Sequence, residues 1–244
     1  MSEPARIPKI IHYCWYGDAQ ISELSRRCMQ TWRDCMPDYA VEAWNEDRLD
    51  MRIPYVREAY RSRQFAFVAD YIRLLTLYDH GGVYLDTDME VLQPLDELLD
   101  TGLFFGLQAP DSVGAGVIGA VKGHPFLKLV LDRLDAEARA GKPQYKPLPE
   151  LLTELAHANA AIAPVLFPEE YFYPYNPYSP LPLKQKPLQS NITERTFCIH
   201  HWEGTWLGGM SLRMMLALRL KAALRLINPA RWARPVARQV AARP

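Results

Sequence analysis

The sequence has little cysteine, no excess charge of either sign and no long apolar run, and each absence excludes a class of protein. Its four cysteines (Cys14, Cys28, Cys35 and Cys198) form no Cys-x-x-Cys pair, which argues against a disulfide scaffold or a zinc site and predicts reduced thiols. Basic and acidic residues are equal at 28 each, so the overall charge gives no sign of nucleic-acid binding. No segment reaches the ~18 uninterrupted apolar residues of a membrane-spanning helix, and no signal-like run opens the chain. We therefore expect a cytoplasmic protein.

What the chain does contain is an ordinary globular composition with an uneven distribution of charge. Hydrophobic residues make up 49% and charged residues 23% of the 244 residues, which excludes wholesale disorder and fibrous folds. Residues 211–244 hold eight basic and no acidic residues, so residues 1–210 hold 20 basic and 28 acidic residues. This asymmetry predicts one large folded domain over 1–210 and a basic tail over 211–244.

Apolar and basic residues of the tail recur at helical spacing, and two interpretations stay open. Such a helix can lie on an anionic membrane, which would place the protein at the inner face of the cytoplasmic membrane. It can also dock on the domain with its basic face in solvent. The apolar positions are Leu212, Met215, Leu216, Leu220, Leu224 and Ile227.

The first elements predict an α/β protein. The apolar stretch from Ile7 to Trp15 indicates a buried strand. Ser22 can cap a helix that Pro37 stops, and Tyr39 to Trp44 then resumes as a strand. Strand, helix and strand in this order are typical of nucleotide-binding α/β sheets.

The strongest pattern in the chain is a helix that leads into an acidic strand end. Gln64 to Tyr78 shows helical apolar spacing, and Gly81-Gly82 supplies the stop. Val83 to Leu85 then predicts a short buried strand that runs into Asp86 and Asp88. Because side chains alternate along a strand, we expect these two carboxylates on the same side.

Two carboxylates at a strand end are ligands that Mg²⁺ or Mn²⁺ prefers, with substrate phosphates completing the shell. An isolated Asp-x-Asp also occurs in solvated turns, so the pair alone is weak evidence. The preceding helix adds Asp70 and Arg73 on one face, as functional groups or as a simple exposed ion pair.

The second half of the domain is less regular. Gly102 to Gly106 and Val113 to Val121 predict strands, and Pro125 to Ala140 predicts an amphipathic helix. Lys142 to Pro187 is rich in proline and aromatic residues, and we expect mostly ordered, non-regular structure there. Cys198 to His200 predicts a last strand.

Three stretches together resemble the glycosyltransferases with the DXD sugar-binding region, family 32. They are IPKIIHYCWYG, FVADYIRLLTLYDHGGVYLDTDMEV and IHHWEGTW, in the order of that family and spanning roughly residues 7–206. The resemblance implies a GT-A fold, that is, an α/β fold with a mixed central sheet, here followed by a helical C-terminal appendage. It implies a hexosyltransferase that moves a sugar from a UDP- or GDP-linked donor with retention of configuration, using Mn²⁺ or Mg²⁺. The acceptor would be a glycan or a lipid-linked glycan in surface polysaccharide synthesis.

The resemblance also assigns roles to residues of the central stretch. Asp86 and Asp88 are similar to the pair that binds the metal and the diphosphate, with Asp88 the more direct ligand. Asp70 and Arg73 match an Asp and an Arg that hold donor-sugar hydroxyls. The charge on the leaving nucleotide would be neutralised by the cation, and covalent and front-face routes to retention both stay open.

The outer stretches supply the remaining candidates. Trp15 falls where related toxins stack an aromatic ring on the nucleobase, and Trp206 resembles a tryptophan that closes over the donor. His201 is the predicted third metal ligand, although the toxins use Glu there. His200 and His201 are adjacent, so in a strand they face opposite ways and at most one is expected to be a ligand.

Two other classes remain as alternatives. A haloacid-dehalogenase-type phosphatase also feeds an apolar strand into Asp-x-Asp, with one Asp as nucleophile. In that class Thr or Val usually follows the motif where this chain has Glu90, and the motif comes near the start. An inactive sugar-binding protein is the second alternative, against which the intact acidic pair argues.

Overall fold

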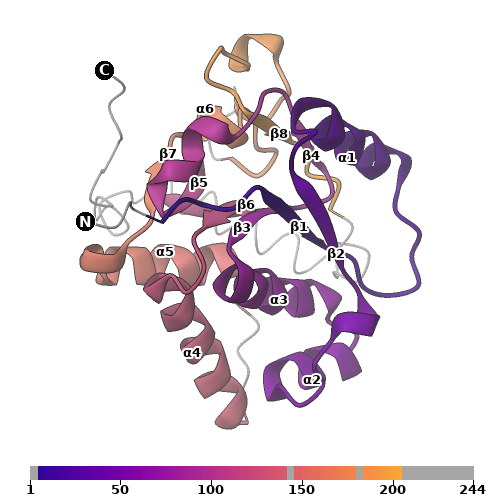
Figure 1. Cartoon of the computed structure of the whole chain (residues 1–244), viewed down its shortest axis with the longest axis vertical. Helices are drawn as coiled ribbons and strands as arrows, with labels where there is room; N and C mark the ends of the chain where they lie inside the picture. Colours follow the sequence, from indigo (N-terminus) through magenta and orange to yellow (C-terminus); the bar gives the residue numbers. More distant parts are fainter. Residues whose placement is uncertain (1–4, 142–145, 180–183, 205–244) are drawn as a thin grey trace.

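A mixed six-stranded sheet lies at the centre of the protein (Figure 1). The structure is a computed structural model that describes residues 5–141, 146–179 and 184–204. The strands of the sheet, in their spatial order, are β2 (Ala40–Trp44), β1 (Ile10–Cys14), β3 (Gly82–Leu85), β6 (Ser112–Ala120), β5 (Leu103–Ala109) and β7 (Val165–Phe167). β1 runs parallel to β2 and β3, whereas β6 is antiparallel to both of its neighbours. A second small sheet pairs β4 (Met89–Val91) with β8 (Cys198–His200).

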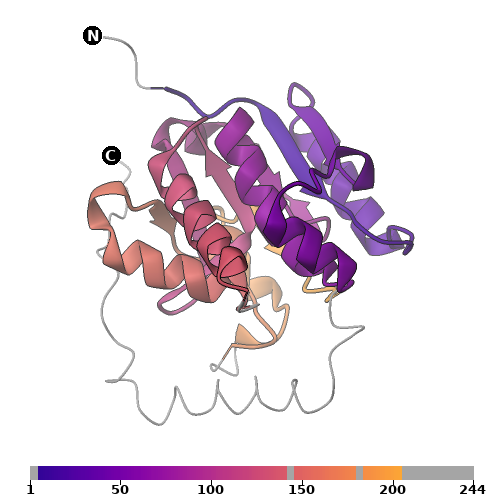
Figure 2. The same cartoon turned by 90° about the horizontal axis from the view of Figure 1, so that it is seen from below.

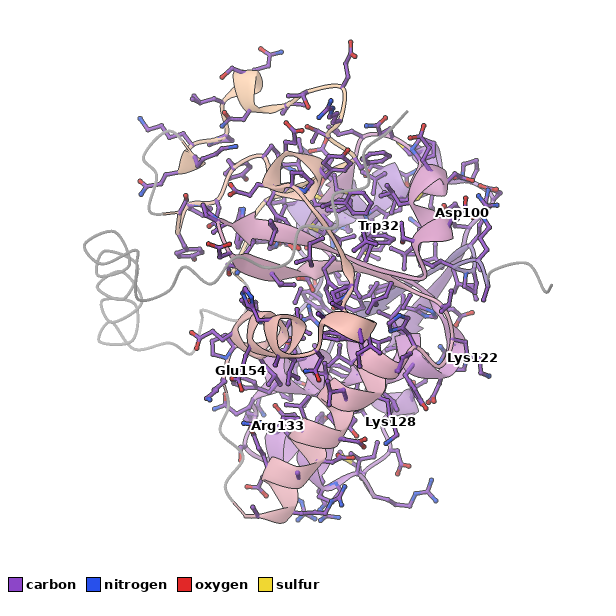
Figure 3. All side chains as sticks on the ribbon, turned by 90° about the vertical axis from the view of Figure 1, so that its left-hand side faces the viewer. Trp32, Asp100, Lys122, Lys128, Arg133 and Glu154 are labelled. Atoms are coloured by element: carbon purple, nitrogen blue, oxygen red, sulfur yellow. The ribbon has the colours of Figure 1, made fainter. Side chains whose placement is uncertain are left out.

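Helices cover both faces of the central sheet, and each face has its own apolar cluster. One cluster contains α2 (Pro54–Arg61), α3 (Phe65–His80), α4 (Pro125–Arg139) and α5 (Leu148–Ala158). The other contains α1 (Glu23–Cys35), α6 (Glu169–Phe172) and the small sheet. Figure 2 shows the first group of helices lying in front of the sheet. In Figure 3 the charged side chains Lys128 and Arg133 lie along the outside of α4, whereas Trp32 of α1 lies inside and is 1% exposed.

α1 forms where the sequence predicts it, for the reasons given there. The Ser22 hydroxyl accepts the Ser25 N–H and caps the first turn. The helix ends before Pro37, and its apolar stripe faces the core. The Trp32 indole N–H donates to the carbonyl of Met89 at 2.7 Å, which ties α1 to β4.

α3 and its glycine stop are also confirmed. Gly81 has a φ of +68° and Gly82 one of +109°, in the left-handed region that favours glycine. A Cβ at Gly82 would lie 2.6 Å from the carbonyl oxygen of Ile10, so the backbone of β3 passes close to β1 here. The two glycines therefore place β3 beside β1 directly after the helix.

The prediction for Lys142 to Pro187 is wrong in part, because this stretch contains α5, β7 and α6. Pro147 precedes α5 and Pro149 lies in its first turn. A proline costs nothing there, since the first N–H groups of a helix have no partner within it. The prolines thus mark the start of a helix. The predictions also omitted α2 and β4, whereas the other predicted strands and α4 are confirmed.

Trp206 and the predicted tail over 211–244 lie outside the described residues. Within the part of the chain that the structure describes, no helix is long and apolar enough to cross a membrane.

Candidate active site

The turn between β3 and β4 carries the acidic pair. The Asp86 N–H donates to the carbonyl of Gly116 at 2.8 Å, and the Met89 N–H donates to the carbonyl of Asp86 at 3.0 Å. The first bond joins the end of β3 to β6, and the second closes a tight turn over residues 86–89. One potential ligand atom each from Asp86, Asp88 and His200 lies within 4.8 Å of the others. The expected convergence of the two carboxylates is confirmed.

Asp86 is held through one of its two oxygens. Its Oδ1 accepts the Tyr84 hydroxyl at 2.9 Å and lies 3.2 Å from Nη1 of Arg73. Its Oδ2 faces Gly116, where an added Cβ would come within 3.2 Å. The absence of a side chain at Gly116 keeps space beside this oxygen, and the Asp86 side chain is 27% exposed.

Asp88 is more enclosed and is oriented by the last described segment. Its Oδ1 lies 3.2 Å from Nε2 of His200, and its Oδ2 accepts the Glu203 N–H at 2.8 Å. Burial opposes the charge, but His200 and the Glu203 N–H favour it and hold the pKa of Asp88 below its usual value. Asp88 is therefore an ionised carboxylate in a mostly buried position.

The structure brings His200 to the acidic pair and places His201 elsewhere. β8 pairs with β4 so that His200 lies opposite Met89. Met89 directly follows Asp88 in the chain, so the pairing brings His200 close to Asp88. His201 instead places its Nε2 2.7 Å from an oxygen of Glu90. The geometry thus differs from the prediction of His201 as third ligand, because neighbouring residues at a strand end point to opposite sides.

Asp70 and Arg73 extend the site onto α3. Arg73 lies with Nη2 3.1 Å from Asp70 and donates through Nη1 to the carbonyl of Ala115 at 2.7 Å. The Asp70 side chain is 17% exposed and that of Arg73 is 8% exposed. They therefore do not form the exposed ion pair considered as an alternative. Burial, with a contribution from Asp86, raises the pKa of Asp70 to about 6, against the opposing effects of Arg73 and the Leu148 N–H. Asp70, Arg73 and Asp86 form one continuous charged chain.

Aromatic side chains surround His200. The Trp202 ring centre lies 4.2 Å from that of His200, and the Tyr173 ring lies edge-on at 5.7 Å. The Tyr173 hydroxyl accepts the N–H groups of Gly116 and Val117, which supports β6 beside Asp86. The sequence predicts no role in the site for Trp202 or Tyr173. Their side chains meet the site only through the fold, and no local pattern marks them.

Trp15 lies directly after β1 and is not among the possible metal ligands. Its indole N–H donates to the carbonyl of Ala19 at 2.7 Å, and its backbone N–H donates to Trp44 at the end of β2. It is partly exposed, at the edge where β1 and β2 end. Because β1 and β3 are parallel, Trp15 lies at the same edge of the sheet as Asp86.

Asp86, Asp88 and His200 fit a divalent cation. The two carboxylates suit Mn²⁺ or Mg²⁺ and leave positions for phosphate oxygens, whereas an imidazole is a ligand for a transition metal such as Mn²⁺ rather than for Mg²⁺. The Nδ1 atom of His200 is buried and has no hydrogen-bond partner among the described residues. A buried polar nitrogen without a partner is costly, and a rotation of the ring that turns Nδ1 toward a cation would relieve that cost.

Comparison with known proteins agrees with the motif. Residues 22–105 match the family model described as "Glycosyltransferase sugar-binding region containing DXD motif". Inositol phosphoceramide mannosyltransferase 3 of Schizosaccharomyces pombe is 31% identical over 141 residues, covering 54% of this chain and 38% of the relative. The chain thus spans less than half the length of that relative. An uncharacterized glycosyltransferase, L373, of Acanthamoeba polyphaga mimivirus is 29% identical over 71% of this chain and 75% of its own.

The fold comparison agrees as well. A solved structure titled PaToxG Glycosyltransferase superposes with a TM-score of 0.50 at 18% identity, covering 65% of this chain and 71% of its own. At that identity the likeness concerns the fold, and the predicted GT-A type α/β fold with a mixed central sheet is confirmed.

Proposed function

Because this chain belongs to the family-32-like DXD glycosyltransferases, we propose that it is a metal-dependent transferase acting on a nucleotide sugar. The observation that carries the proposal is that His200 meets Asp86 and Asp88 at the end of β3. The two aspartates lie within the matched residues 22–105, and His200 lies outside them. The donor would be UDP- or GDP-linked, and the sugar would be transferred with retention of configuration. The phosphatase alternative is not favoured, since the comparisons name transferases.

In this proposal Asp86, Asp88 and His200 hold Mn²⁺ or Mg²⁺, with His200 in the place first predicted for His201. The cation supplies Lewis-acid neutralisation of the leaving nucleoside diphosphate. Arg73 and the Tyr84 hydroxyl fix Asp86 before substrate binds, so its orientation costs no rearrangement during the reaction. Because the cation neutralises the charge on the leaving diphosphate, the reaction needs no side chain that donates a proton to it.

The donor is proposed to lie along the edge that joins Trp15 to α3. Trp15 would contact the base, and Asp70 and Arg73 the sugar hydroxyls, as the family resemblance implies. The buried, mutually paired state of Asp70 and Arg73 supports this, because a paired carboxylate accepts hydroxyl hydrogens in a fixed geometry. By the same resemblance, Trp206 would close over the donor.

For the acceptor we propose a glycan carried on a lipid, in the synthesis of a surface polysaccharide or glycolipid. The yeast relative is named as an inositol phosphoceramide mannosyltransferase, which supports a lipid acceptor and makes mannose the first sugar to test. A location on the cytoplasmic side of a membrane, with the basic tail against anionic lipid, belongs to the same proposal.

Asp88→Ala tests the proposal. We expect Mn²⁺-dependent turnover of the active donor, found by screening UDP- and GDP-sugars that include GDP-mannose, to fall by about 100-fold or more. Lewis-acid stabilisation is worth several kcal/mol, and each 1.36 kcal/mol corresponds to a factor of ten. NMR of the product anomer checks retention.

Asp132→Ala, which removes an exposed carboxylate on α4, is the matched control and should keep wild-type turnover. Unchanged turnover in folded Asp88→Ala protein, or the absence of turnover with every donor in the wild type, would contradict the proposal.

A further inference from the structure

Three polar side chains from distant parts of the sequence meet beside the turn that carries Asp86 and Asp88. Ser25, in the first turn of α1, is fully buried. Its hydroxyl oxygen lies 2.9 Å from a carboxylate oxygen of Glu203 and 3.2 Å from the hydroxyl oxygen of Thr87. We call Ser25, Thr87 and Glu203 the clasp. It joins α1, the residue between Asp86 and Asp88, and the segment after β8.

The chemistry of the clasp fixes the direction of its bonds. An ionised carboxylate can only accept hydrogen bonds, and a hydroxyl carries one hydrogen. Ser25 therefore donates to Glu203, and its oxygen is left to accept from Thr87. Hydrogen bonds to a carboxylate are shorter and stronger than those between neutral groups, which agrees with the shorter Ser25–Glu203 distance.

The Ser25 hydroxyl is not needed to form its own helix. The N-terminal cap of α1 is the Ser22 hydroxyl, which accepts the Ser25 N–H at 2.9 Å. The side chain of Ser25 points instead to Glu203, 178 residues further along the chain. The cap uses the Ser22 side chain and the clasp uses the Ser25 side chain, so a substitution can remove either one without the other.

Glu203 connects the clasp to Asp88. Its side chain is held by Ser25, while its backbone N–H donates to Oδ2 of Asp88 at 2.8 Å. The neighbouring His201 N–H donates to the backbone carbonyl of Asp88 at 3.1 Å. A shift of Glu203 would therefore move the donor that orients the Asp88 carboxylate.

We propose that Ser25 and Glu203 are positioning residues that hold Asp88 in the orientation required to bind the divalent cation. This inference rests on the metal site of the proposed function and adds residues outside its ligand set. Groups that orient metal ligands commonly contribute 10–100-fold to metal affinity. The clasp orients Asp88 through a peptide N–H, so its loss affects the affinity for the cation before any substrate binds.

The test is a titration of the purified full-length chain with Mn²⁺, following free Mn²⁺ by electron paramagnetic resonance without any donor present. Ser25→Ala and Glu203→Ala should each raise the Kd by about 10-fold or more. The double variant should bind no more weakly than the weaker single variant, because both changes remove the same contact. Glu203→Gln keeps an acceptor oxygen and should stay within about threefold of wild type.

Ser22→Ala is the matched control on the same helical turn. It should lower the melting temperature by weakening α1, while the Kd for Mn²⁺ stays at the wild-type value. If Ser25→Ala does not fold, the comparison of Glu203→Ala with Glu203→Gln carries the test, since Glu203 lies at the surface end of the clasp.

The outcomes separate the two proposals. Wild-type protein that binds no Mn²⁺ overturns the proposed metal site itself. Wild-type protein that binds Mn²⁺, together with folded Ser25→Ala and Glu203→Ala variants of unchanged Kd, overturns the clasp alone. Fully additive losses in the double variant also overturn it, because independent effects would mean that the Ser25–Glu203 contact does not carry the coupling.

Discussion

His12 of β1 has a defined protonation state because both of its ring nitrogens have a partner. Nε2 lies 2.9 Å from the carbonyl oxygen of Gly81, and Nδ1 lies 3.2 Å from the indole nitrogen of Trp44. A carbonyl can only accept and an indole N–H can only donate. The ring is therefore neutral with its hydrogen on Nε2, and it joins β1 to β2 and to the end of α3.

Acid should weaken this contact and with it the folded state. Burial lowers the pKa of His12 below the ordinary value of 6.5. At pH values between the lowered pKa of the folded state and the pKa of 6.5 in the unfolded state, the unfolded chain binds more protons than the folded one. The free energy of unfolding therefore falls as the pH drops through this range. We expect the free energy of unfolding, measured in urea, to fall by about 1 kcal/mol more in wild type than in His12→Gln between roughly pH 7.5 and 5.5. Parallel pH profiles of the two proteins would refute this account.

At the scale of elements, β5 and β6 pair closely only because one residue lacks a side chain. Phe104 lies opposite Gly119 in the ladder, and a Cβ at Gly119 would come 1.9 Å from a ring carbon of Phe104. The ring is fully buried, stacked on Phe172 and edge-on to Phe167. These neighbouring rings limit how far Phe104 can move.

Gly119→Ala should consequently destabilise the fold by about 1–3 kcal/mol, measured by urea unfolding, because the added methyl overpacks the core. Phe104→Leu should also destabilise, by leaving a cavity. The double variant should lose less than the sum of the two changes, since the smaller side chain makes room for the methyl. Simple additivity would show that the Gly119–Phe104 contact does not limit the packing.

The elements that could be predicted are those whose signals are local. Ser22 and Pro37 bound α1, and Gly81 ends α3, because caps and breakers act within a turn or two. The choice between His200 and His201 depends on the register of β8 against β4, more than 100 residues away in the chain, and no local pattern encodes it. The contact of Ser25 with Glu203 escapes prediction for the same reason.

At the scale of the whole molecule, the order and direction of the strands place the candidate site residues at one edge of the central sheet. β1, β2 and β3 are parallel, so their carboxyl ends, with Trp15 and Asp86 directly after two of them, lie at the same edge of the sheet. Ligands of open α/β sheets bind at such edges. The late segment with His200 reaches this edge through its pairing with β4, which brings the proposed metal ligands together from both halves of the chain.

The distribution of charge over the whole chain gives the last prediction. Residues 211–244 carry eight basic and no acidic residues, whereas residues 1–210 have a net charge of −8. A basic segment binds anionic lipid with about 1 kcal/mol for each Lys or Arg near the surface. In flotation assays we expect the full-length chain to bind vesicles that contain phosphatidylserine and not vesicles of phosphatidylcholine alone. Raising the salt from about 0.1 M to 1 M should release it, because the screening length falls from ~10 to ~3 Å.

A full-length variant with four tail residues changed to Gln separates the two interpretations of the tail. We expect it to bind anionic vesicles at least about 100-fold more weakly, since some 4 kcal/mol of attraction is removed. Its donor turnover in solution should stay unchanged, because the changes lie outside the proposed donor site. If the variant and the wild type bind the vesicles equally, these basic residues do not bind the membrane, and the proposed lipid acceptor must reach the site by another route. The four changes are Arg213→Gln, Arg219→Gln, Lys221→Gln and Arg225→Gln.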